Sequence, residues 1–301
     1  MGHSLAQNFA QYGYNVWLND VREEILAEAK SLIASNLKTL VEMGLLNETQ
    51  VKATLDRIRT TCKLHEAGKD ADFVIEAIIE NKEAKISLFN NLDQICPKHA
   101  ILASNTSFMD IYKFLETGRP EKILITHWFA PPHIVPLVEV VRGPQTTQET
   151  VDQVKELLIK VGKKPLVISK FLPGFIANRL QNAMRNEVLF LLDNGYATAE
   201  EIDIATKNSF GLRTPINGSA QRIDFAGMEQ TQRTILNADH KLSPQIKKSK
   251  TVEEMIAKGR LGVKNGKGLY DYGGRTPAGI MKERDIKLIK LRNFLMELGE
   301  L

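Results

Sequence analysis

The fold of this chain is decided by the stretch Ile123-Leu-Ile-Thr-His-Trp-Phe-Ala-Pro-Pro-His-Ile-Val-Pro-Leu-Val-Glu-Val-Val141. Its two apolar runs, Ile123–Ile125 and Leu137–Val141, are typical of buried strands. The prolines between them predict a turn, so the second run is expected to double back along the first. This hairpin-like path brings Glu139 back beside His127. A partner is expected there, because a carboxylate inside an apolar strand costs several kcal/mol to bury alone.

A histidine paired with a buried glutamate has two interpretations. At the carboxyl end of a sheet, His127 can act as a general base whose ring is oriented by Glu139. Alternatively, His127 is a structural side chain that caps a strand, and Glu139 is an interior salt-bridge partner. The pair alone leaves both interpretations open.

Polar side chains lie at the end of a neighbouring strand and near the start of a later helix. The apolar run at 100–103 leads into Ser104, Asn105, Thr106 and Ser107, at a strand end where an α/β sheet usually presents its ligand. Downstream, Pro173-Gly-Phe-Ile-Ala-Asn-Arg179 opens a long predicted helix and places Asn178 about one turn inside it. Asparagine is a poor helix former, so a polar function is expected of it. Turn chemistry alone also explains a polar strand end.

Four motifs in chain order give the sequence a family resemblance. They are Ser-Asn-Thr-Ser at Ser104–Ser107, His-x-Phe with a following proline at His127, Pro-Leu-Val-Glu at Pro136–Glu139, and Pro-Gly-Phe-Ile-x-Asn-Arg at Pro173–Arg179. With these motifs the chain resembles the L-3-hydroxyacyl-CoA dehydrogenase family from Gly2 to about Tyr272. The resemblance implies that the catalytic residues are Ser107, His127, Glu139 and Asn178.

Length and charge narrow the class of protein. The chain has 301 residues, which is enough for two domains of ordinary size. Its formal net charge of +4 is small and its lysines are spread among glutamates, which argues against nucleic acid as a main partner. No apolar stretch approaches the length that spans a membrane, and no signal peptide is expected before the first predicted helix.

The cysteines and histidines predict a reduced compartment and no metal site. The two cysteines, Cys62 and Cys96, fit a cytoplasmic protein and suggest no disulfide framework. Clusters of the kind that bind zinc are lacking, and His127 and His133 with one distant glutamate make a weak case for a metal.

Strands and helices alternate through the first half of the chain. The predicted strands lie at 15–20 and 73–77, near Ile101 and His127, and at 137–141 and 165–168. The predicted helices lie at 22–43, from 48 onward, at 82–95 and at 147–161. This alternation predicts parallel βαβ units in a Rossmann-type, doubly wound α/β sheet.

From Pro173 onward the β signals vanish and helices are predicted throughout. A helix over 174–194 is expected to end at Gly195, and capping boxes at Thr198–Glu201 and Thr251–Glu254 are expected to start two more. The expected domains are residues 1–170, which bind a dinucleotide, and residues 171–301, which form an all-helical C-terminal domain for substrate and dimer contacts.

The chain begins at the opening of a predicted helix, with no strand before it. In a dinucleotide-binding unit, Gly2 matches the third glycine of G-x-G-x-x-G. Asp20 follows after about 20 residues, where an acid binds the adenosine ribose hydroxyls and favours NAD over NADP. The first strand is absent, so roughly a dozen residues are expected to be missing upstream. Alternatively, Gly2 merely follows the initiator and Asp20 is a turn residue.

The resemblance implies further cofactor contacts. Glu80 and Lys85 match family positions near the cofactor and its ribose, and Asn105 matches a position near the nicotinamide. Surface polar residues at a helix start are a competing interpretation for these three.

The resemblance also implies a mechanism and an assembly. His127 would exchange the hydroxyl proton while a hydride passes between C3 of the substrate and NAD, and Glu139 would fix the tautomer of its ring. Ser107, together with Asn178 from the helical domain, would polarise the substrate oxygen. The helical domain of the family forms a homodimer contact, and the apolar helix at 180–192 is consistent with one.

The sequence departs from the family pattern in two places. Ala130 replaces an asparagine that usually follows His-x-Phe, which removes a polar group beside the site. Family members that act on CoA thioesters commonly carry lysines in the region of residues 40–45, whereas this chain has Glu42 there and Lys38 as the nearest base. Residues 132–139 and 178–181 resemble the lambda-crystallin branch, which is similar to dehydrogenases of free 3-hydroxy acids such as gulonate or carnitine.

Three functions follow from these patterns. The first is reversible NAD-dependent oxidation of an L-3-hydroxyacyl-CoA, and the second is the same chemistry on a small free 3-hydroxy acid. The third is a non-catalytic, crystallin-like dimer. An idle site has no physical need for a buried Glu139, which argues against the third.

Overall fold

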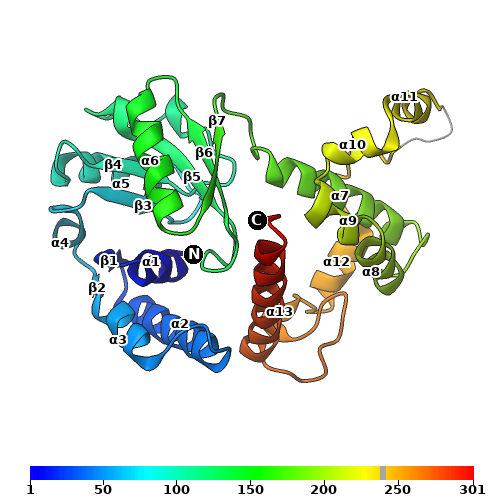
Figure 1. The fold of residues 1–301 in the computed structure, drawn as a ribbon, viewed down its shortest axis with the longest axis horizontal. Coiled ribbons are helices and arrows are strands. Elements are labelled where there is room, and N and C mark those ends of the chain that lie inside the picture. The colour runs from blue at the N-terminus through cyan, green and yellow to red at the C-terminus, as the bar shows by residue number, and fades with distance from the viewer. Residues whose placement is uncertain (238–241) are drawn as a thin grey trace. The chain divides into compact units, whose positions relative to one another are not determined.

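The computed structural model describes residues 1–237 and 242–301 of the chain. It divides into two compact units, residues 1–178 and residues 179–301 (Figure 1). The first unit contains the strands and the second consists of helices, so the expected order of an α/β part followed by a helical part is confirmed.

The strands of the first unit form two sheets. Parallel strands β1 and β2 make the smaller sheet, and the larger sheet has the order β3-β4-β5-β6-β7. Every pair of the larger sheet is parallel except β5 and β6, which are antiparallel. That exception is the hairpin-like path predicted from the prolines. The strands are β1 Val16–Asn19, β2 Ile58–Thr61, β3 Phe73–Glu76, β4 Ile101–Ser104, β5 Ile123–Trp128, β6 Leu137–Arg142 and β7 Lys164–Ile168.

Helices of the first unit connect these strands. Three of them begin at side chains that accept a backbone N–H, namely Asn47, Asn81 and Thr147, which is the usual way to satisfy a free helix end. The helices are α1 Gly2–Gln11, α2 Glu23–Glu42, α3 Glu48–Asp56, α4 Leu64–Gly68, α5 Lys82–Ile95 and α6 Gln148–Lys160, with short 3-10 turns η1 Ile111–Lys113 and η2 Pro120–Lys122.

The larger sheet is covered on both faces. Side chains alternate along a strand, so Leu124 of β5 packs with α1 and α6 on one face and Ile125 packs with α5 on the other. Both faces are apolar, which is the arrangement of a doubly wound sheet. The same alternation places His127 and Glu139 on the face of Ile125 and Val141, where α5 packs.

In its described residues, 179–237 and 242–301, the second unit is helical apart from two isolated bridges at Gly262–Lys267 and Lys267–Asp271. Helix α7 Ala177–Asp193 leads into it. The other helices are α8 Ala199–Asn208, α9 Phe210–Asn217, α10 Gln221–Ala226, α11 Met228–Leu236, α12 Lys250–Ala257 and α13 Pro277–Glu297, with a 3-10 turn η3 Val263–Asn265. No helix in the described ranges is long and apolar enough to cross a membrane.

Two of the three helix boundaries predicted for this unit are confirmed. Gly195 adopts a left-handed φ of 68° two residues after the last residue of α7, and Thr198 forms a capping box with Glu201 at the start of α8. The capping box predicted at Thr251 is wrong, because α12 begins earlier and is capped by Ser249. Asp193 accepts hydrogen bonds from the Ser249 hydroxyl and the Thr251 backbone N–H, and these bonds fix the earlier start.

Candidate active site

The hairpin of β5 and β6 places His127 directly opposite Glu139. The two residues are register partners across the antiparallel pair, a position in which side chains of one face meet. The His127 Nδ1 atom lies 2.9 Å from a carboxylate oxygen of Glu139, and both residues are buried. The predicted pair is therefore present in the structure.

Glu139 has partners for both of its oxygens. One oxygen contacts His127, and the other accepts the backbone N–H groups of Ile176 and Ala177 at 2.9 Å each. Burial alone raises the pKa of Glu139, but these three hydrogen bonds outweigh it and hold the pKa below its ordinary value. The carboxylate is thus ionised at neutral pH and can only accept hydrogen bonds.

This geometry sets the tautomer of His127. Because the Glu139 carboxylate has no proton to donate, Nδ1 of the histidine must be the protonated nitrogen. The Nε2 atom is then the basic nitrogen, and it has no hydrogen-bond partner within residues 1–237 and 242–301. Phe129 and Phe175 contact the ring, with ring centroids 4.5 and 5.3 Å away. The imidazole is held in place by packing, and its Nε2 atom is left without a partner among the described residues.

The polar residues after β4 lie next to this hairpin. Asn105 accepts the backbone N–H of Trp128 through its side-chain oxygen at 2.9 Å, which ties the end of β4 to the residue after His127. Ser107 lies two residues further along and is partly exposed. Its backbone N–H donates to Glu80, while its hydroxyl has no partner among the described residues.

Asn178 lies at the start of α7 rather than one turn inside it. The sequence predicted a helix from residue 174, but Gly174 and Phe175 have left-handed φ angles of 77° and 52°, which a right-handed helix does not allow. The helix begins at Ala177, whose N–H donates to Glu139. Asn178 is the last residue of the first compact unit, at its boundary with the second. That the helical domain supplies it stays a prediction.

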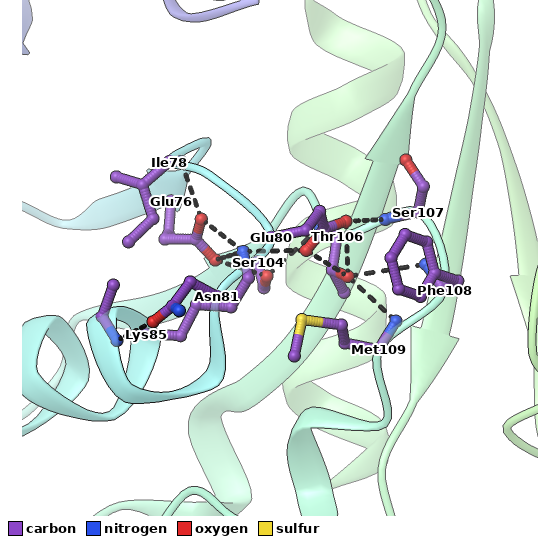
Figure 2. A network of polar contacts seen from close by, with 11 residues as sticks. Glu76, Ile78, Glu80, Asn81, Lys85, Ser104, Thr106, Ser107, Phe108 and Met109 are labelled. Carbon is purple, nitrogen blue, oxygen red and sulfur yellow. Dashed lines mark hydrogen bonds and ion pairs between the residues drawn. The ribbon is translucent and has the colours of Figure 1, made fainter.

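Glu80 and Lys85 lie beside Ser107, in a network that the sequence did not predict. Figure 2 shows Lys85 pointing toward Glu76 and Glu80. Lys85 is 1% exposed, so its ammonium group is enclosed by protein atoms. Glu76 was missed, although it carries the same signal as Glu139, a single acid within an apolar run.

The residues expected to bind the dinucleotide lie on α1 and after β1. Gly2 begins α1, and a Cβ atom there would touch Leu18 of β1 at 3.4 Å, so the helix lies close on that strand. Asp20 follows β1, and its carboxylate accepts one backbone N–H, from Arg22 at 3.3 Å. The remaining oxygen capacity of Asp20 is suited to the two hydroxyls of a ribose. This acceptor fits the ribose hydroxyls of NAD.

Comparisons with known proteins cover both parts of the chain. Residues 1–171 match the family described as "3-hydroxyacyl-CoA dehydrogenase, NAD binding domain". Residues 174–272 match "3-hydroxyacyl-CoA dehydrogenase, C-terminal domain".

Individual relatives match over nearly the full length. A probable 3-hydroxybutyryl-CoA dehydrogenase of Bacillus subtilis is 36% identical over 282 residues, with 92% of this chain and 95% of the relative covered. The 5-formyl-3-hydroxy-2-methylpyridine 4-carboxylate 5-dehydrogenase of Mesorhizobium japonicum is 29% identical, with 98% and 95% covered.

Solved structures agree with these matches. An NAD+-dependent FHMPC 5-dehydrogenase, an enzyme for the same pyridine carboxylic acid, has a TM-score of 0.86 at 28% identity and covers 98% of this chain and 95% of its own. The (S)-3-hydroxybutyryl-CoA dehydrogenase of Ralstonia eutropha has a TM-score of 0.71 at 31% identity, with 91% and 95% covered. The chain therefore belongs to the 3-hydroxyacyl-CoA dehydrogenase family and is an NAD-dependent dehydrogenase of that family.

Proposed function

We propose that the protein catalyses the reversible oxidation of an L-3-hydroxyacyl-CoA to the 3-oxoacyl-CoA, with His127 as general base and acid. The observation that carries this proposal is the His127–Glu139 pair, in which Nδ1 is bonded and Nε2 is free of partners in the described part of the chain. Bound NAD supplies a hydride acceptor for C3 of the substrate. His127 removes the hydroxyl proton at Nε2 during oxidation and returns it during reduction.

Two further side chains bind the substrate oxygen in this proposal. The Ser107 hydroxyl and the Asn178 amide have no partner among the described residues, so both are available as hydrogen-bond donors. Donors aimed at the oxygen stabilise the negative charge that develops there in the transition state. Gly2, Asp20 and Asn105 contact the cofactor, and Glu80 and Lys85 lie near it.

The test of this function is His127→Gln. Glutamine has a similar size but no basic nitrogen, so the rate of hydride transfer should fall roughly 10²–10⁴-fold. NADH binding and melting temperature should stay close to those of the unaltered protein. Single-turnover oxidation of NADH with acetoacetyl-CoA measures the rate. Normal turnover in this variant would rule out the general-base role.

A free 3-hydroxy acid is the second candidate substrate, of the gulonate or carnitine kind. Helix α2 carries four glutamates and two lysines, a balance that does not favour the phosphates of CoA. The similarity to the FHMPC dehydrogenase, whose named substrate is a pyridine carboxylic acid and not a thioester, supports the same candidate. The chemistry at His127 is identical for both substrates.

One assay separates the two candidates. NADH oxidation is compared for acetoacetyl-CoA and for a series of free 3-oxo acids at equal concentration. A kcat/KM at least about tenfold higher for the thioester supports the CoA substrate, and the reverse ratio supports the free acid. A tenfold ratio corresponds to a difference of about 1.4 kcal/mol in free energy. NADH binding with no turnover of either class would favour the non-catalytic, crystallin-like alternative.

We further propose that the enzyme is a homodimer that assembles through its helical unit. Helix α7 has no buried residue, and α9 to α11 expose large apolar side chains that include Leu212, Phe225 and Ile235. Exposed apolar patches of this kind mark interaction surfaces. A cytoplasmic location remains a prediction from the sequence, consistent with two unpaired cysteines.

A further inference from the structure

A buried ion-pair network lies between the ends of β3 and β4 and the loop that carries Ser107. Lys85 places its Nζ atom 2.7 and 2.8 Å from the two carboxylate oxygens of Glu76, and 3.3 Å from Glu80 (Figure 2). The side chains of Lys85 and Glu76 are 1% and 0% exposed. A lysine and a glutamate this deeply buried must stay paired. Removing either one would leave the other charge buried with neither solvent nor a counter-charge to stabilise it.

The Glu76 carboxylate is fully occupied by its neighbours. Besides Lys85, it accepts the Ser104 hydroxyl at 2.6 Å and the backbone N–H of Ile78 at 2.8 Å. The Ser104 hydroxyl in turn accepts the backbone N–H of Thr106 at 3.2 Å. Glu76 and Lys85 therefore form a rigid support for the loop after β4.

Glu80 connects the buried pair of Glu76 and Lys85 to Ser107. Its carboxylate accepts the backbone N–H of Ser107 at 2.7 Å and the Thr106 hydroxyl at 2.9 Å. The Thr106 oxygen also accepts the backbone N–H of Met109 at 3.0 Å, so the backbone on both sides of Ser107 is held. Figure 2 shows these contacts converging on Glu80 from the loop, with Lys85 on its other side.

We propose that Glu80 is a positioning residue for Ser107, and that the buried pair of Glu76 and Lys85 fixes the place of Glu80. This inference rests on the proposed role of Ser107 as a donor to the substrate oxygen. A donor helps only when it is already aimed at the site of developing charge, and small misplacements of a catalytic group are costly. Glu80 acts on the reaction through Ser107, and Lys85 acts through Glu80.

The experiment is a double-mutant cycle on the full-length protein. Ser107→Ala, Glu80→Ala and the double variant are compared in kcat, in KM for the 3-oxo substrate and in the dissociation constant of NADH. Ser107→Ala should lower kcat roughly 10²-fold, as expected for the loss of an oxyanion donor. Glu80→Ala should lower kcat about tenfold when Ser107 is present and less than about twofold when it is already replaced, because interacting residues are not additive.

The buried pair is tested with a neutral replacement. Lys85→Met alone would leave the Glu76 carboxylate buried without a cation, so it is combined with Glu76→Gln. The amide oxygen of the glutamine can accept the Ile78 N–H, and its NH₂ group can donate to the Ser104 hydroxyl oxygen. This combination should lower kcat by a factor similar to Glu80→Ala, and again only while Ser107 is present. The matched control is Asp93→Asn, which breaks the ion pair between Asp93 and the buried Arg119 at 2.7 Å. It should lower the melting temperature and leave kcat unchanged.

Three outcomes would overturn the inference. Equal losses from Glu80→Ala with and without Ser107 would mean that Glu80 acts independently of it. A weaker affinity for NADH with an unchanged kcat would make Glu80 a cofactor contact. Full kcat in Ser107→Ala would remove the group that Glu80 is said to position. The proposed function fails separately, through normal turnover in His127→Gln.

Discussion

At the scale of single residues, Glu139 determines which nitrogen of His127 can act as a base. Its oxygens accept hydrogen bonds from His127, Ile176 and Ala177, so a replacement must satisfy three donors. In Glu139→Gln the amide oxygen is needed by the two backbone N–H groups, and the amide NH₂ then faces Nδ1. The histidine must accept that hydrogen bond and carry its proton on Nε2 instead.

Glu139→Gln should therefore reduce turnover roughly 10³–10⁴-fold, as is typical when a catalytic histidine is locked in the wrong tautomer. The double variant with His127→Gln should lose far less than the product of the two single losses. Single-turnover rates and melting temperatures of the three variants measure this. A purely structural pair would lower thermal stability and leave the rate per folded molecule intact.

The depressed pKa of Glu139 also predicts a pH dependence of stability. A carboxyl group whose pKa is lower in the folded than in the unfolded protein stabilises the fold at pH values above its unfolded-state pKa. This contribution is lost as the pH falls through the folded-state pKa. The difference in melting temperature between the unaltered protein and Glu139→Gln should be full at pH 7 and shrink below about pH 4. Thermal melts at several pH values measure it, and a constant difference would contradict the assignment.

Asp20 is expected to set the choice of cofactor. It follows β1 with one hydrogen bond to backbone, and a 2′-phosphate at this position would face its negative charge. Asp20→Ala should lower the preference for NAD over NADP by about 1–3 kcal/mol, the value of a charge-assisted hydrogen bond. The ratio of kcat/KM for NADH and NADPH measures this. Equal use of both cofactors by the unaltered enzyme would refute it.

At the scale of elements, the turn before α7 aims two backbone N–H groups at Glu139. Gly174 and Phe175 both have left-handed φ angles, and Phe175 is completely buried. A side chain at Gly174 would strain this turn. Gly174→Ala should destabilise the protein by about 1–2 kcal/mol and lower kcat, because Ile176 and Ala177 would be displaced from Glu139. Melting temperature and kcat are measured together. Unchanged values in both would show that the turn is not strained by a Cβ atom.

Local patterns predicted most elements but not those fixed by distant contacts. The helix expected at 82–95 is α5, with Asn81 capping it as an N-cap residue should. Strand β2 was not predicted, because its polar sequence Ile-Arg-Thr-Thr lacks an apolar alternation and it pairs with β1 alone. The late start of α7 and the early start of α12 depend on hydrogen bonds to Glu139 and Asp193, which are far away in sequence.

In the candidate site, too, local sequence patterns predicted some contacts and missed those that depend on distant residues. The pair of His127 and Glu139 was predictable, since the prolines and the two apolar runs define a hairpin and its register. The contacts of Lys85 were not, because a lysine on a helix start is usually solvated and only the partners from β3 reveal that it is buried. Its role near the cofactor stays a prediction.

At the scale of the whole molecule, the helical unit exposes large apolar side chains that the proposed dimer would bury. Its buried apolar residues in the described range are Ile202, Ile289 and Leu295, whereas Phe225 and Ile235 are 72% and 77% exposed. A two-fold dimer uses each residue twice, once from each copy. Burying one such side chain contributes about 1.5–3 kcal/mol, so each position contributes about 3–6 kcal/mol to a dimer.

Phe225→Asp and Ile235→Asp should therefore weaken the proposed dimer by at least about 10²-fold in dissociation constant, since 1.4 kcal/mol corresponds to a factor of ten. Sedimentation velocity over a range of concentrations measures the constant. Ile159→Asp is the matched control, because Ile159 is similarly exposed at 59% but lies on α6 of the first unit. It should leave the dimer intact. A chain that sediments as a monomer before any substitution would refute the dimer, and equal weakening by all three variants would place the contact elsewhere.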